Sequence, residues 1–169
     1  MKEKLKKVRL KDGTFAYNCD IFGGDDVSFT KPVNVTGNIF LGVRADTDNL
    51  TAGEDIILGD YASTGKLSAG RTIKVGKMSA IGNSSAAKSI FLGNGSFAGD
   101  LSAKNIFIGR HSFVDFLNAT ENISVGRCST LLDSTAGGSI SIGSKCNYTF
   151  LKANKDITIA GKKFRPNHN

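Results

Sequence analysis

The amino-acid sequence predicts an all-β protein, a single-domain parallel β-helix (β-solenoid) with triangular coils of about 17 residues. Three observations carry this prediction. A glycine recurs at intervals of 17, 17, 17, 16, 17 and 17 residues. An isoleucine stands three residues before each of these glycines, and an alanine stands ten residues after each. Self-similarity at such a period indicates structural units that bury their apolar faces by stacking on one another.

These positions form continuous rows along the chain. The recurring glycines are Gly42, Gly59, Gly76, Gly93, Gly109, Gly126 and Gly143. The isoleucines are Ile39, Ile56, Ile73, Ile90, Ile106, Ile123, Ile140 and Ile157. The alanines are Ala52, Ala69, Ala86, Ala103, Ala119, Ala136 and Ala153. The rows predict eight to nine coils, in which equivalent residues lie about 4.8 Å apart.

Side chains of a β-strand alternate between its two faces, so inward-facing positions come in pairs two residues apart. Each repeat contains three such pairs. One is the isoleucine with the aliphatic residue before the glycine, one is a small residue with an aliphatic residue after the glycine, and one ends in the alanine. Examples are Ser79 with Ile81, and Leu67 with Ala69. Three short inward-facing strands in each repeat describe a triangular coil.

The remaining repeat positions predict corners. A turn-forming residue, such as Asn38 or Asp55, stands before each isoleucine. The recurring glycine follows the first strand, where we expect a corner that requires a positive φ. The recurring alanine suits a narrow place where two sides of the coil approach each other.

The N-terminal part is less regular. Residues 21–42 fit one further coil, with five apolar side chains inward, namely Ile21, Val27, Phe29, Val33 and Val35. Before it, Asp12-Gly13 lies between two alternating runs, which predicts a hairpin or irregular cap from Lys7 to Cys19. A helix from Met1 to Leu10 is the alternative. We therefore divide the chain into a basic N-terminal segment and cap (1–20), the solenoid (21–161) and a short tail (162–169).

Charge is concentrated at the ends of the chain, whose net charge is +7. Six of the first eleven residues are basic, namely Lys2, Lys4, Lys6, Lys7, Arg9 and Lys11. This cluster is either a solvated tail or a contact for an anionic membrane surface. No apolar run of signal-peptide or membrane-span type is present, and the three cysteines have no metal-site spacing. These features predict a cytoplasmic protein.

The sequence offers little for catalysis. His168 lies in the polar tail, and His111 lies at an expected corner, where a lone histidine is far more often solvent-exposed than catalytic. Left-handed acyltransferase solenoids use a six-residue repeat, which this period does not fit, and no long loop interrupts the coils to shape a pocket. Cys146 takes an inward position, where a packed thiol is expected. We predict no enzyme, cofactor, metal or nucleic-acid site.

Outward positions are more informative, because a solvated face would be polar throughout. Two residues before the recurring glycines, the first half of the row is largely apolar and the second half is polar. A second outward pair lies on the next side of the coil. Together these rows predict an outward apolar face of Phe40, Ile57, Phe91, Phe107, Phe97 and Phe113. Such aromatic ladders either bind a partner or stabilise the solenoid by stacking.

The run from Gly65 to Gly109 resembles the bactofilins. The family's cadence of Gly-polar-Leu/Ile-x-Ala followed by Ile-x-Ile-Gly is similar to "GKLSA" and "GDLSAKNIFIG". The resemblance extends over about Val33 to Gly161. It implies a right-handed triangular β-helix, a bacterial cytoskeletal protein that polymerises end to end without nucleotide, and a location at the inner membrane surface. It also implies cell-wall or morphogenesis proteins as partners. The chain departs from the family in its N-terminal cap, its few prolines and its larger number of coils.

The expected function is therefore a non-enzymatic scaffold in cell shape, whose first partner is a second copy. The last predicted strand, with Ile157 and Ile159, is expected to present an open edge beside Phe164. These three residues are the predicted self-assembly interface of a tail-to-tail dimer or a filament. The alternative is a monomeric binding module, such as a bacterial effector, that uses the outward apolar face.

Overall fold

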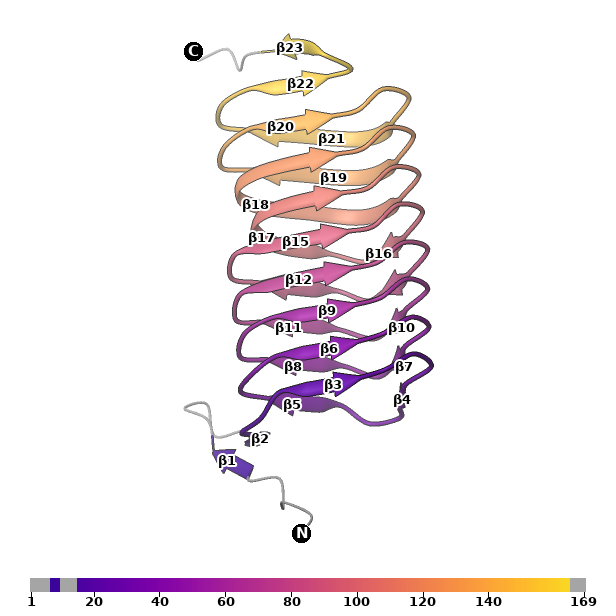
Figure 1. The fold of residues 1–169 in the computed structure, drawn as a ribbon. Coiled ribbons are helices and arrows are strands. Elements are labelled where there is room, and N and C mark those ends of the chain that lie inside the picture. The colour runs from indigo at the N-terminus through magenta and orange to yellow at the C-terminus, as the bar shows by residue number, and fades with distance from the viewer. Residues whose placement is uncertain (1–6, 10–14, 165–169) are drawn as a thin grey trace.

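The computed structural model describes residues 7–9 and 15–164, and this part of the chain contains strands and turns but no helix. The protein is a parallel β-solenoid of about eight turns with about 17 residues per turn. This confirms the fold class and repeat length that the sequence predicts. Figure 1 shows the turns stacked in one direction, with the N-terminal strands at one end and the C-terminal strands at the other.

The strands form three parallel ladders, which we call A, B and C. Ladder A begins with β3 (Ile21–Gly23), β6 (Ile39–Leu41), β9 (Ile56–Leu58), β12 (Thr72–Val75) and β15 (Ser89–Leu92). Ladder B begins with β4 (Ser28–Phe29), β7 (Asp46–Thr47), β10 (Ser63–Thr64), β13 (Ala80–Ile81) and β16 (Phe97–Ala98). Ladder C begins with β2 (Phe15–Tyr17), β5 (Val33–Val35), β8 (Leu50–Ala52), β11 (Leu67–Ala69) and β14 (Ser84–Ala86).

In the later coils single strands run around corners and belong to more than one ladder. The longer strands are β17 (Leu101–Ile108), β18 (Phe113–Val125), β19 (Thr130–Ala136) and β21 (Asn147–Ala153). Ladder A ends with β20 (Ile140–Ile142) and β22 (Ile157–Ile159). The single 16-residue repeat is accommodated at a corner, where the register of β17 against β18 shifts between Ala103 and Asn105.

The predicted inward rows form the core. Isoleucines from Ile39 to Ile140 pair in register on ladder A and are almost completely buried. The leucine and alanine rows of ladder C are buried in the same way, as in Leu67 and Ala69. Each rung thereby removes the same apolar groups from water, which is the main source of stability in a stacked repeat.

A row of hydroxyl groups is buried at the corner between ladders A and B. Ser79, Ser96, Ser112 and Ser129 stack on successive coils and are at most 3% exposed. The Ser79 backbone N–H donates to Ser96 Oγ at 3.1 Å, and Ser96 Oγ donates to the Gly76 carbonyl at 3.2 Å. Each hydroxyl thus links its own coil to the preceding one. In the last coil Cys146 replaces the serine, as the inward position predicts, and its Sγ lies 3.1 Å from the Gly126 carbonyl.

The reason for the recurring glycines differs from the predicted one. None of them has a positive φ, so the expectation of left-handed backbone at these positions was wrong. Their backbones instead lie almost in contact from coil to coil. A Cβ added to Gly59 would be 2.6 Å from the Gly42 carbonyl carbon, and other glycines of the row meet the preceding glycine as closely. Glycine is required because any side chain there would separate two coils.

The left-handed residue of each coil lies two positions after the glycine. Most of these residues are not glycine, although L-residues with side chains adopt this conformation at some cost. Along the stack they are Asp26, Arg44, Tyr61, Met78, Gly95, His111, Cys128 and Lys145. The close packing of the preceding glycines therefore imposes this backbone conformation whatever side chain follows.

Each end of the solenoid carries one antiparallel strand. At the N-terminal end, β1 (Lys7–Arg9) pairs with β2, which in turn pairs with β5 of ladder C. This pairing has the form of the predicted hairpin rather than of a helix, and its turn lies outside the described residues. At the C-terminal end, β23 (Lys162–Phe164) pairs with β22 through a two-residue turn at Ala160 and Gly161. Both turn residues have positive φ, as a type I′ hairpin requires.

The β22–β23 hairpin corrects the prediction of an open edge at Ile157 and Ile159. Their strand is hydrogen-bonded to β20 on one side and to β23 on the other. A hairpin needs far less chain than another coil does. Two residues are enough for the chain to reverse and cover the edge of its own last strand.

We predict that Gly59→Ala destabilises the protein by about 3 kcal/mol, because the added methyl group cannot fit against the Gly42 backbone. Gly24 is the matched control, since it lies at the first corner and an added Cβ meets nothing within 4 Å. Gly24→Ala should change the free energy of unfolding by less than about 0.5 kcal/mol. Urea denaturation followed by circular dichroism measures both values. Equal effects of the two substitutions would show that stacking does not explain the glycine row.

A buried hydroxyl group leads to a prediction of increased, rather than decreased, stability. Thr47 is 7% exposed, and its Oγ1 has no hydrogen-bond partner among the described residues. Thr47→Val keeps the shape of the side chain and removes the unsatisfied group, so it should stabilise the fold by about 1 kcal/mol. Thr64, one coil further, donates to the Gly65 carbonyl at 3.2 Å, and Thr64→Val should give no such gain. Thermal unfolding of the two variants compares them, and a loss of stability in Thr47→Val contradicts the packing described.

Candidate binding surfaces

The predicted outward apolar face consists of separate patches. Phe91 and Phe107 stack on adjacent rungs of ladder A, with ring centroids 4.7 Å apart and an angle of 6° between their planes. Phe40 and Ile57 lie three and two coils nearer the N-terminus than Phe91, and exposed Lys74 separates them from it. The row is therefore interrupted by a charge, and a partner would meet two short apolar strips.

One member of this row is missing from the sequence-based prediction. Phe22 stacks on Phe40 with ring centroids 5.2 Å apart and is 76% exposed, the largest exposure among the described aromatic residues. The sequence does carry its signal, because Phe22 stands two residues before Gly24 just as Phe40 does before Gly42. The irregular first coil conceals the match.

The remaining predicted pair lies on ladder B. Phe97 and Phe113 are in register, and their ring centroids are 6.4 Å apart in a tilted arrangement. Both rings are exposed. Stacking of in-register aromatic residues stabilises neighbouring strands by itself, so these pairs contribute to the solenoid whether or not they bind a partner.

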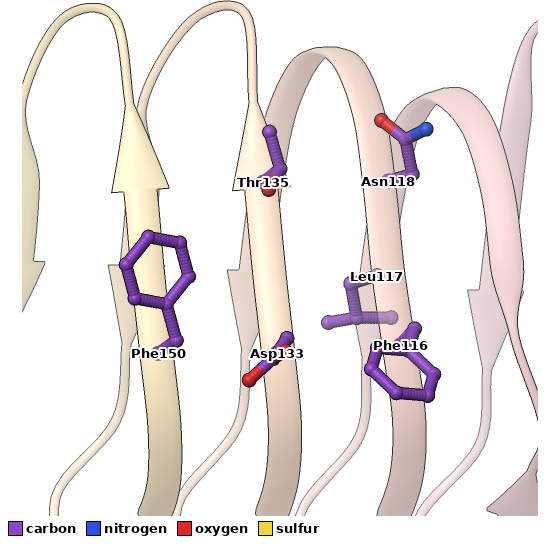
Figure 2. A pocket seen from close by; sticks show the side chains of 6 residues that line it. All are labelled: Phe116, Leu117, Asn118, Asp133, Thr135 and Phe150. Carbon is purple, nitrogen blue, oxygen red and sulfur yellow. The ribbon is translucent and has the colours of Figure 1, made fainter.

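A second surface, absent from the sequence-based prediction, lies at the corner between ladders B and C. Phe116, Asp133 and Phe150 occupy equivalent positions on β18, β19 and β21, and Asp133 is in register with both rings. Together with Leu117, Asn118 and Thr135 they line an open depression of about 350 Å³. In Figure 2 both rings are seen nearly face-on, Asp133 lies on the strand between them, and its carboxylate extends to the same side as the Phe116 ring, whereas the Phe150 ring extends the opposite way along its strand. We call this surface the Phe–Asp–Phe notch.

The notch occurs where the corner changes its construction. In earlier coils Gly65, Gly82 and Gly99 break the strand at this corner. From the sixth coil on, the strand continues through the corner, and the glycine position holds Asp115, Leu132 or Thr149. The loss of glycine at an otherwise regular position is the signal that the sequence carries for this surface.

The predicted self-assembly residues do lie together. Ile157 pairs in register with Phe164, and Ile159 with Lys162, so all three predicted residues belong to the terminal hairpin. The two isoleucines are half-buried, and Phe164 is exposed. The open edge at this end is instead that of β21, whose described pairing is with β19 alone.

Charged side chains pair mainly from coil to coil. Arg44 and Asp26 form an exposed ion pair at 2.6 Å, and the hydrogen bond from Arg44 lowers the pKa of Asp26. Lys104 donates to Glu121 at 2.9 Å and, together with Asn105, lowers the pKa of that carboxyl group. Both pairs are exposed and solvent-screened, so they adjust the surface charge rather than hold the fold.

The remaining predicted residues are described only in part. His111 is exposed at its left-handed corner. Within residues 7–9 and 15–164, no group of three His, Cys, Asp or Glu residues is placed to hold a metal ion, and the three cysteines are free thiols. Of the basic N-terminal residues, Lys7 and Arg9 belong to β1, whereas Lys2, Lys4, Lys6 and Lys11 lie outside the described residues.

Comparison of the chain with protein-family models, with curated proteins and with solved structures finds no match. Among the residues that the structure describes, no helix is long and apolar enough to span a membrane. The geometry of the outward surfaces and of the two ends is therefore the basis on which a function can be inferred.

Proposed function

We propose that the protein is a non-enzymatic structural scaffold that self-assembles end to end. The observation that carries the proposal is the set of unsatisfied strand edges at the two ends of the solenoid. In the described part of the chain, β21 pairs only with β19, and β3 and β4 pair only with β6 and β7. An unpaired edge with apolar side chains beside it is a template for another chain unless it is covered.

The C-terminal end has the shape of a step. β20 and β21 belong to the same coil. Beyond this coil, ladder A is extended by β22 and β23, whereas ladders B and C end with β21. Tyr148 stacks above Leu131 at an inward position but is 40% exposed, because no further strand of the described chain lies above it. The step thus exposes core positions beside a free backbone edge.

Two such steps complement each other across a twofold axis. The β22–β23 hairpin of each copy would lie on the β21 side of the other copy. The dimer would then contain two equivalent contacts, each between β23 of one copy and β21 of the other. The contact would cover Tyr148, Leu151 and Phe164, all of which are incompletely buried in one copy. This keeps the tail-to-tail arrangement but moves the contact from Ile157 and Ile159 to the step. Association through the open N-terminal strands would extend the dimers into filaments.

The resemblance to bactofilins supports a role for this scaffold in bacterial cell shape, with cell-wall or morphogenesis proteins as further partners. The stacked coils, with short turns between their strands, form an elongated body that suits a rod carrying other proteins. A cytoplasmic location and attachment at the inner face of the membrane belong to the same proposal.

We expect sedimentation velocity to give dimers or larger species for the unmodified protein at micromolar concentration. Phe164→Arg should weaken this association by more than about tenfold, because it buries a charge in the contact. Phe97→Arg is the matched control, since Phe97 is an equally exposed aromatic residue far from both ends, and it should sediment like the unmodified protein. Circular dichroism checks that both variants retain their β-structure.

A monomeric unmodified protein would overturn the proposal. If Phe164→Arg and Phe97→Arg have the same effect, association occurs through the outward surface and not through the ends. Gly24→Ala should abolish filaments and leave dimers. Its methyl group would obstruct another copy stacked on the N-terminal end, but it meets nothing in a single chain.

The basic N-terminal segment leads to a prediction about membranes. Each Lys or Arg near an anionic surface contributes about 1 kcal/mol of attraction, which salt screens. Replacement of Lys2, Lys4 and Lys6 by glutamine should reduce co-sedimentation with phosphatidylglycerol vesicles. Replacement of Lys66, Lys74 and Lys88 removes the same charge from the solenoid and should have a smaller effect. Equal losses would show that net charge, rather than this segment, determines binding.

The second candidate function is a monomeric binding module that uses the outward apolar strips. The observation in its favour is the exposure of Phe22, Phe91 and Phe107, which stacking alone does not require. Monomeric sedimentation with unchanged β-structure would favour this function over the scaffold.

A further inference from the structure

We propose that the Phe–Asp–Phe notch is a binding site for an arginine side chain of a partner protein. The inference rests on Phe116, Asp133 and Phe150 and is independent of end-to-end assembly. It requires three properties of the site: an uncompensated carboxylate, accessible aromatic faces, and a spacing that lets one guanidinium group reach both.

The Asp133 carboxylate has no partner within the described chain. It makes no hydrogen bond or ion pair with another described residue, although it is half-buried. Some other acidic groups on the surface pair with cations, as Glu54 does with Arg71 and Glu121 with Lys104. In a chain of net charge +7, an unpaired carboxylate between two aromatic rings is unusual and attracts a cation.

Acidic and basic residues both lie near the notch. Asp115 directly precedes Phe116, and Asp100 occupies the position equivalent to Phe116 one coil earlier. The basic residue next along β21, Lys152, is in register with Thr135 rather than with Asp133. Asp133 therefore lies near two further carboxylates, and Lys152 is its diagonal rather than its directly paired neighbour on β21.

The rings are placed to receive a cation on their faces. Phe116 is 46% exposed and Phe150 is 52% exposed, and their faces are directed outward in Figure 2. A cation is attracted to the face of an aromatic ring, and arginine is the usual partner because its planar group also stacks. Hydrophobic packing alone would not explain why two bulky rings flank a carboxylate at the surface.

The register lets one guanidinium group use both kinds of contact. Asp133 is paired with Phe116 on one side and with Phe150 on the other, so the backbones of the three residues follow one another at intervals of about 4.8 Å. A guanidinium group that lies flat on either ring can donate two parallel hydrogen bonds to the carboxylate. Lysine has a compact ammonium group and cannot make this combination as well.

Saturation-transfer-difference NMR with Nα-acetyl-arginine amide tests the proposal, and it tolerates an assembled protein. The side-chain protons of the ligand should receive saturation, and Nα-acetyl-citrulline amide, a neutral ligand of the same shape, should bind about fivefold more weakly. Asp133→Asn should weaken arginine binding by about fivefold, and Phe150→Ala by about threefold. Both altered side chains lie at the surface, and thermal unfolding checks that the variants are folded.

Asp46→Asn is the matched control, because Asp46 is an exposed carboxylate on ladder B far from the notch. It should leave arginine binding unchanged. Equal binding of the arginine and citrulline ligands would overturn the proposal. So would retention of binding in Asp133→Asn with loss in Phe150→Ala, which would indicate a neutral stacking ligand such as a sugar. Equal losses of arginine binding in Asp46→Asn and Asp133→Asn would show that the overall charge of the protein, and not the notch, determines binding.

Discussion

Contact between the backbones of successive coils is the constraint on which the rest of the molecule depends. At the glycine row the added Cβ of Gly59 would lie 2.6 Å from the preceding coil, which leaves no room for a side chain. Once the coils are this close, every residue lies beside its equivalent one repeat away. An inward isoleucine then packs on isoleucine, and a buried serine hydroxyl accepts from the backbone of its neighbour. The same contact imposes a left-handed residue two positions later, even where a side chain makes that conformation costly.

The sequence predicts most of the features that this contact repeats in every coil, and it misses features that occur once. The fold class, the inward rows and the repeat length follow from periodicity, because stacking requires the same chemistry at the same place. The reason for the glycines could not be predicted, since steric exclusion and positive φ both favour glycine and a sequence does not distinguish them. The β22–β23 hairpin is hard to predict because Ala160-Gly161 lacks the Asn or Asp typical of its turn type. The Phe–Asp–Phe notch is equally hard to predict, because its three residues are 17 positions apart and only the later coils carry them.

Stacking also determines which parts of the surface are available for function. Within the stack each strand is hydrogen-bonded on both edges, so backbone groups there cannot bind another chain. Within the described chain, strands with a free edge occur at the two ends, and one ladder is extended at each end. There β2 and β1 extend ladder C at the N-terminal end, and β23 covers ladder A at the C-terminal end. Side chains on the outward rows are free along the whole length. The molecule therefore has two kinds of surface, namely ends suited to a second copy and sides suited to a different partner.

These two kinds of surface reinforce each other if both proposals hold. In the proposed joint between ends the Phe–Asp–Phe notch would stay open on its outward side, although Phe150 lies on the same strand as the free edge. One exposed notch would bind one arginine weakly, because a cation–π contact at an exposed site is worth only about 0.5–1 kcal/mol. A dimer or filament presents the same notch at fixed intervals, and a partner with several arginines would then bind through many weak contacts at a high effective concentration. Assembly would thus convert a weak site into a selective one, so that the partner recognises the assembled scaffold in preference to the single chain.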